Sequence, residues 1–139
     1  MRLVVDTSIL IAGLLKASTT RRLLLDPALD LIIPELALEE IGRHAAMIRQ
    51  RTGLTREAFD LLMALLTSHL EIIPDTRIHP WLSKARHTFE GRDPGDVPFL
   101  AAAYAMPCDG IWSDDADFDV VTDVTIWTTA RLLKHLRLT

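Results

Sequence analysis

Acidic side chains are the residues of this chain whose type and spacing could do chemistry. They occur at four separate places: Asp6, the pair Glu39–Glu40, Asp96, and the cluster Asp114, Asp115 and Asp117. Carboxylates that are brought together repel one another unless a cation lies between them. Hard divalent cations prefer such oxygen ligands, and Mg²⁺ keeps several waters that a substrate can displace. Two such ions could activate a water and stabilise a leaving oxygen when a phosphodiester is hydrolysed.

Short apolar runs that alternate with helical patterns should bring these acids to one edge of a sheet. Strands are expected at 3–5, 31–33, 71–73, 111–112 and 124–127. Unbroken apolar strands that alternate with helices are typical of a parallel sheet covered on both faces. We therefore predict an α/β fold of three layers, α/β/α, with a central parallel sheet of about five strands. Asp6 follows the first strand and Asp114 the fourth, so both should lie at the edge where such sheets bind ligands.

Helical periodicity separates the two glutamates of the second place. A helix is expected from Pro34 to about Gln50, and its apolar stripe consists of Leu38, Ile41, Ala45 and Ile48. At 100° per residue, Glu40 lies beside this stripe, whereas Glu39 lies nearly opposite it. Glu40 can therefore reach a site at the sheet edge, and Glu39 should face water.

The remaining helices are expected at turn and capping signals. Thr7 or Ser8 can cap the first helix and Asp96 the helix 97–105. Further helical segments are expected after Ser18, from Thr55, over 78–90, and at the end of the chain through Leu136. Each acid also has an ordinary alternative, since Asp6 and Asp96 could be plain helix caps and Asp117 a loop residue.

Length, cysteine content and hydropathy limit the class of protein. A chain of 139 residues predicts one domain over residues 1–139. The single cysteine, Cys108, cannot form an internal disulfide, which favours a reducing compartment. No apolar run is long enough to span a membrane, and the first residues lack the layout of a signal peptide. We therefore expect a cytoplasmic protein without membrane contact.

Charge is distributed unevenly along the chain. Residues 93–130 contain eight aspartates and no Lys or Arg, so this stretch carries a charge of −8. Because the net charge of the chain is −4, the remaining residues together carry +4. Arg43, Arg49 and Arg51 belong to the positive part and follow Glu40 along the chain. They could border the site and hold the phosphates of a polyanion, although a solvated helix surface is the ordinary alternative. The five histidines are scattered, which argues against a zinc site.

Four segments, in this order, resemble the PIN domain, a family of small α/β metal-dependent nucleases. The segments are 4–12, 34–41, 92–101 and 111–118, and together they span nearly the whole chain. The resemblance implies that Asp6, Glu40, Asp96 and Asp115 hold Mg²⁺, with Mn²⁺ as a substitute. It adds Asp114 and Asp117 as further acids, and Thr7 or Ser113 as hydroxyls that orient a carboxylate.

The resemblance also implies a function and partners. Many PIN domains are VapC-like toxins, so we expect an endoribonuclease that is the toxin of a toxin–antitoxin pair. RNA would be its substrate, with Arg43, Arg49 and Arg51 as candidate RNA contacts. A homodimer is expected, as is an antitoxin whose peptide covers or enters the acidic site. A catalytically inactive module that binds RNA or protein is the alternative. A magnesium-dependent phosphatase is disfavoured, because no second aspartate lies two residues after Asp6.

Overall fold

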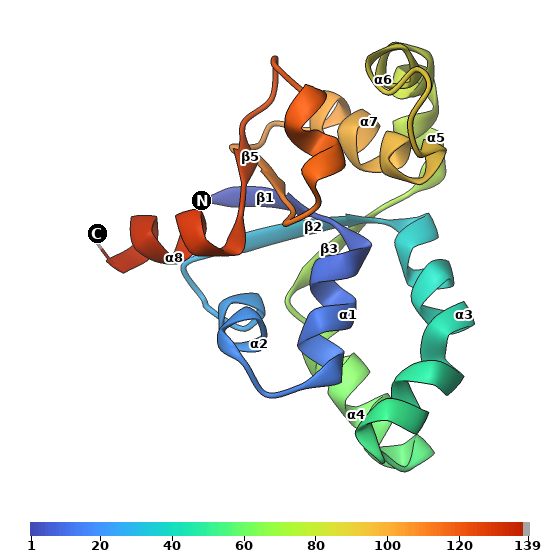
Figure 1. Cartoon of the computed structure of the whole chain (residues 1–139), viewed down its shortest axis with the longest axis vertical. Helices are drawn as coiled ribbons and strands as arrows, with labels where there is room; N and C mark the ends of the chain where they lie inside the picture. Colours follow the sequence, from blue (N-terminus) through green and yellow to red (C-terminus); the bar gives the residue numbers. More distant parts are fainter. Residues whose placement is uncertain (138–139) are drawn as a thin grey trace.

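The computed structural model describes residues 1–137, and its centre is a five-stranded sheet with helices on both faces (Figure 1). The strands are β1 (Arg2–Val5), β2 (Asp30–Pro34), β3 (Leu70–Ile73), β4 (Gly110–Trp112) and β5 (Ile126–Trp127). Their order across the sheet is β3-β2-β1-β4-β5, and all neighbours are parallel. The predicted α/β/α architecture is therefore confirmed.

The strand order creates a switch point between β1 and β4. From β1 the chain first builds β2 and β3 on one side, and it then returns to place β4 on the other side of β1. Ligands bind at such points, beyond the carboxyl ends of the strands. The register pairs Val5 with Trp112, and the Asp6 backbone N–H donates to the Trp112 carbonyl at 3.1 Å. Asp6 and the residues after Trp112 therefore emerge side by side.

Seven of the helices form the two outer layers. On one face lie α1 (Thr7–Leu15), α2 (Thr19–Leu24), α3 (Glu35–Thr52) and α4 (Arg56–Thr67), as Figure 1 shows. On the other lie α5 (Asp75–Ile78), α6 (Leu82–Thr88) and α7 (Val97–Ala105), and α8 (Thr129–Arg137) follows β5. Three short 3₁₀ segments complete the elements: η1 (His79–Trp81), η2 (Pro94–Asp96) and η3 (Ala116–Val120).

The central strands are buried on both faces, which is why their residues form unbroken apolar runs. Leu3, Val4 and Val5 of β1 are fully buried, as are Ile111 and Trp112 of β4. Burial of this apolar surface is the main favourable contribution to folding. Gly110 begins β4 at a φ of 139°, and a Cβ there would lie 2.1 Å from the Thr125 carbonyl oxygen. Only glycine fits this close approach of β4 and β5.

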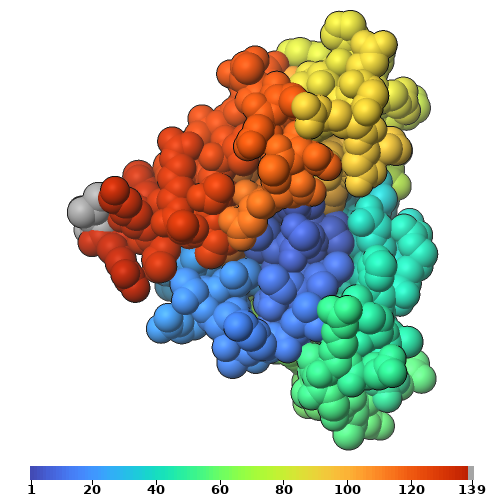
Figure 2. Space-filling model, in the orientation of Figure 1, coloured from blue at the N-terminus to red at the C-terminus, as the bar shows by residue number. Residues whose placement is uncertain are grey.

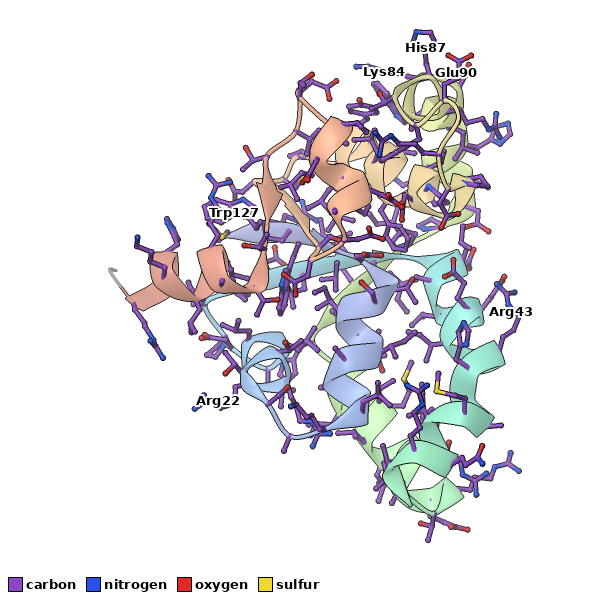
Figure 3. All side chains as sticks on the ribbon, in the orientation of Figure 1. Arg22, Arg43, Lys84, His87, Glu90 and Trp127 are labelled. Atoms are coloured by element: carbon purple, nitrogen blue, oxygen red, sulfur yellow. The ribbon has the colours of Figure 1, made fainter. Side chains whose placement is uncertain are left out.

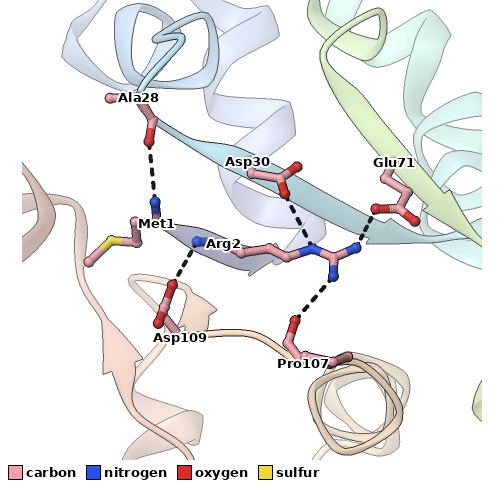
Figure 4. Close-up of polar contacts among 7 residues, drawn as sticks. All are labelled: Met1, Arg2, Ala28, Asp30, Glu71, Pro107 and Asp109. Atoms are coloured by element: carbon pink, nitrogen blue, oxygen red, sulfur yellow. Dashed lines mark hydrogen bonds and ion pairs between the residues drawn. The ribbon is translucent and has the colours of Figure 1, made fainter.

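Arg2 joins several elements at the amino ends of the strands, opposite the end at which Asp6 lies (Figure 4). Its guanidinium pairs with Asp30 of β2 at 3.4 Å and with Glu71 of β3, and it donates to the Pro107 carbonyl at 3.3 Å. Its backbone N–H donates to Asp109 Oδ2 at 2.8 Å. These contacts join β1, β2, β3 and the connection from α7 to β4 at the amino end of β1. They leave the carboxyl end of β1 free for other chemistry.

Several element boundaries differ from those expected from the sequence. Helix α1 begins at Thr7, so Asp6 occupies the N-cap position and neither Thr7 nor Ser8 does. The segment 78–90 is divided into α5, η1 and α6, because Pro80 has no N–H for a continuous helix. Strand β5 contains only residues 126–127, since the three-residue β4 pairs with it over two positions. No helix within residues 1–137 has the length and apolar content to cross a membrane.

Candidate metal centre

The structure brings the four acidic places together in one cavity of about 230 Å³. Asp6 enters it from the end of β1, Glu40 from the second turn of α3, Asp96 from the start of α7, and Asp115 from the segment after β4. Figure 2 shows α1 (blue) exposed on one face of the molecule, between α3 (teal) and the C-terminal segments (orange). The cavity lies where these elements meet, at the switch point of the sheet.

Asp6 is buried and is held by two hydroxyl groups. Its Oδ2 accepts hydrogen bonds from Ser113 Oγ at 2.7 Å and from Ser8 Oγ at 2.8 Å. Burial raises the pKa of Asp6, while the bonds from Ser113 and Ser8 act in the opposite direction. The side chain makes no capping hydrogen bond to α1 although Asp6 is its N-cap residue. Asp6 is therefore oriented toward the cavity, and the interpretation as a plain helix cap does not describe it.

Asp96 is buried among the other acids, and one of its carboxylate oxygens has no partner within residues 1–137. Its side chain is 6% exposed, and the oxygen concerned is Oδ2. It does not cap α7. Burial, followed by the charges of Asp115 and Asp6, raises the pKa of Asp96 to about 7. An unpartnered buried carboxylate oxygen needs a proton or a cation, because desolvation penalises its free charge.

Glu40 enters the cavity from the flank of α3. Burial raises the pKa of Glu40, while the nearby Thr7 side chain and the charge of Arg43 act in the opposite direction. Its neighbour Glu39 is exposed, as the helical periodicity predicts. Thr7 Oγ1 is buried without a hydrogen-bond partner within residues 1–137, so of the two expected hydroxyls only Ser113 binds a carboxylate, that of Asp6.

Asp114 and Asp115 have different partners. Asp114 accepts hydrogen bonds from the Thr129 backbone N–H at 2.7 Å and from Thr129 Oγ1 at 2.6 Å, so its carboxylate binds the start of α8. Asp115 lines the cavity, and its backbone N–H donates to Ser113 Oγ at 3.0 Å. Its Oδ1 accepts from the Asp117 N–H at 2.9 Å, which fixes the segment that follows. Within this pair, only Asp115 faces the other acids.

A further acid, Asp93, lies in the centre although it is not among the residues that the family resemblance implies. Its carboxylate accepts from the Gly95 N–H at 2.9 Å, which fixes the turn Asp93-Pro94-Gly95. It also lines the acidic cavity. Oxygen atoms of Asp93, Asp96 and Asp117 lie within 4.8 Å of one another, so these three residues could hold a metal ion. The signal in the sequence was the spacing of three residues between Asp93 and Asp96.

The three arginines expected near the site have different positions. Arg43 is exposed on α3 and points away from the helix in Figure 3. Arg51 is also exposed. Arg49 lines a separate cavity of about 350 Å³ between α3 and α4, where its Nε has no hydrogen-bond partner within residues 1–137. None of the three lines the acidic cavity, and Arg43 acts on it through its charge.

The donor set fits a hard divalent cation. The acidic cavity offers carboxylate oxygens from several acids, one of them buried and unpartnered, and their mutual repulsion contributes to the raised pKa of Asp96. A divalent cation would compensate these charges and satisfy the free oxygen.

Comparisons with known proteins agree with this geometry. The sequence model of a family described as PIN domain matches residues 4–137. No curated protein sequence matches the chain.

Proposed function

The chain belongs to the PIN-domain family, and from that premise we propose that it is a metal-dependent endoribonuclease, the toxin of a toxin–antitoxin pair. PIN domains are generally nucleases and typically use divalent metals, and the acidic cluster of this chain could bind such an ion. The observation that carries the proposal is the buried Oδ2 of Asp96, which lacks a partner within residues 1–137 and lies in a cavity lined by carboxylates.

Asp6, Glu40, Asp96 and Asp115 would hold Mg²⁺ or Mn²⁺. A bound divalent cation supplies activation of a water and stabilisation of charge on the phosphate. The protein's own contribution is orientation: the hydroxyls of Ser113 and Ser8 hold the Asp6 carboxylate. Asp93 and Asp117, which approach Asp96, would provide oxygens for a second ion or for waters of the first.

The partners follow from the same proposal. RNA is the substrate, and Arg43 and Arg51 are the candidate phosphate contacts on the exposed surface of α3. A toxin of this family would form a homodimer, and its antitoxin would cover the acidic cavity with a peptide. We also propose that the chain acts as a single domain in the cytoplasm, where a lone cysteine such as Cys108 stays reduced.

Cleavage of end-labelled RNA tests the function. We expect cleavage with Mn²⁺, none with EDTA, and none by Asp6→Asn, which keeps the shape of the side chain but loses its charge. Asp30→Asn is the matched control, because Asp30 lies at the opposite edge of the sheet in the ion pair with Arg2. Labelled DNA of the same sequence tests the preference for RNA. RNA binding without cleavage in any metal would instead support the inactive module.

A further inference from the structure

We propose that the RNA strand leaves the acidic cavity along one flank of α3, where His44 is the first phosphate contact and Arg51 the next. The inference rests on the proposed function and deepens it, because it assigns a direction to the substrate and adds His44 to the site. Neither residue type nor spacing distinguished His44 from the other histidines in the sequence.

The helix geometry places three residues on this flank. At 100° per residue, Glu40, His44 and Arg51 lie within about 40° of one another around the axis of α3. They span eleven residues, or about 16 Å along the helix. Glu40 and His44 both line the acidic cavity, which shows that this flank faces the candidate metal centre.

The opposite flank of α3 is occupied differently. Gly42, Ala45, Ala46 and Arg49 line the second cavity together with residues of α4. Arg49 lies about 180° from Glu40 around the helix, so it cannot reach a strand that follows the Glu40 flank. The structure therefore places Arg51 on the same flank of α3 as the acids and Arg49 on the opposite flank. Arg43 lies about 60° from Glu40, outside the sector that Glu40, His44 and Arg51 share.

His44 is the side chain of the cavity that remains available to donate to a phosphate oxygen. Of the two hydroxyls in the cavity, Ser8 donates to Asp6, and Thr7 Oγ1 is buried, so neither is open to a phosphate. The other polar side chains of its lining are carboxylates, which repel a phosphodiester. His44 is exposed, and within residues 1–137 its imidazole makes no hydrogen bond.

Arg51 supplies the charge for the next phosphate. It is exposed, and its guanidinium forms no ion pair within the described part of the chain. A free guanidinium binds a phosphate by parallel hydrogen bonds and adds an attraction that salt weakens.

Binding of a fluorescent single-stranded RNA in EDTA, at several salt concentrations, tests the strand path. Arg51→Gln should lower the slope of log affinity against log salt by about 0.7, the value for one phosphate contact of a single strand. Arg56→Gln is the control: it removes an exposed arginine that lines the cavity on the other flank. An unchanged slope in Arg51→Gln, or an equal loss in Arg56→Gln, would overturn the proposed path.

Cleavage kinetics with Mn²⁺ test the role of His44. His44→Leu should reduce kcat/KM roughly tenfold, as for loss of one hydrogen bond to a charged group, while His44→Gln should recover most of it because the amide still donates. His87→Leu, an exposed histidine at the far end of the molecule in Figure 3, should have no effect. Equal rates for His44→Leu and the wild type would overturn the assignment.

The two proposals fail in different ways. If the wild type cleaves RNA and Asp6→Asn does not, but the His44 and Arg51 variants behave as wild type, the function stands and the path is wrong. If the wild type neither binds nor cleaves RNA, both are wrong. Arg51-dependent binding of a polyglutamate peptide in place of RNA would assign this flank to a protein partner and overturn the path.

Discussion

Ser113 Oγ lies 2.7 Å from Asp6 Oδ2, although 107 residues separate the two along the chain. The parallel register of β1 and β4 brings them together, because both follow directly on paired strand residues. The same Ser113 oxygen accepts the backbone N–H of Asp115 at 3.0 Å. One buried hydroxyl therefore connects two of the acids proposed to hold the metal, and it fixes their relative position.

Removal of this hydroxyl should weaken metal binding more than it weakens the fold. Ser113→Ala leaves Asp6 without its shorter hydrogen bond and frees the segment at Asp115, so we expect Mn²⁺ affinity to fall about 10- to 100-fold. Isothermal titration calorimetry measures the change. Ser83→Ala, which removes an exposed hydroxyl on α6, should leave the affinity as it is. Equal affinities for Ser113→Ala and the wild type would show that the hydroxyl does not orient a ligand.

Substitution of Asp114 should affect the stability of the fold, whereas substitution of Asp115 should affect metal binding. Asp114→Ala loses two hydrogen bonds to Thr129 at the start of α8, so the free energy of unfolding should fall by about 1–2 kcal/mol with Mn²⁺ affinity retained. Asp115→Ala should instead lose Mn²⁺ affinity and RNA cleavage. Urea denaturation and calorimetry on both variants give the two quantities. The reverse pattern would assign Asp114 to the metal.

The pKa of Asp96 predicts how stability depends on pH without metal. Between its ordinary value of 3.8 and about 7, folded Asp96 keeps a proton that the unfolded chain has lost. The free energy of unfolding in EDTA should therefore fall as pH rises through this range, by up to about 1.4 kcal/mol per pH unit.

Asp96→Asn tests this dependence, because it removes the ionisation from both states. The variant should show a flatter pH profile and should be more stable than the wild type at pH 8 in EDTA. Urea denaturation at pH 5 and pH 8 compares the two proteins. Parallel profiles would mean that Asp96 ionises in the folded protein as it does in the unfolded chain.

Metal should stabilise the folded protein through the clustered acids. A cation at 100 times its dissociation constant adds about 2.7 kcal/mol if only the folded state binds it. For a domain of this size the melting temperature should rise by roughly 5–11 °C. Asp6→Asn should melt above the wild type in EDTA, because one repelling charge is lost, and should gain less from Mn²⁺. Melting curves that are indifferent to Mn²⁺ would leave the acids as surface charge.

The sequence by itself determined the features that depend on local periodicity. Alternating apolar strands and helices identified the α/β fold, and the strands ending before Asp6 and Asp114 identified the edge where the acids gather. Helical phase distinguished the half-buried Glu40 from the exposed Glu39. These features are local because the direction of a side chain depends only on its position within its own strand or helix.

Only the tertiary structure decided which of several similar residues face the site. Asp114 and Asp115 are adjacent and chemically identical. Thr129 donates two hydrogen bonds to Asp114, whereas the carboxylate of Asp115 lines the cavity. Asp93 becomes part of the centre because the fold places it in the lining of the acidic cavity, with oxygens of Asp96 and Asp117 within 4.8 Å. The unpartnered oxygen of Asp96 likewise depends on the strands and helices that bury it. Such relationships join distant parts of the chain, so they depend on long-range packing, whereas periodicity records only the environment of each element.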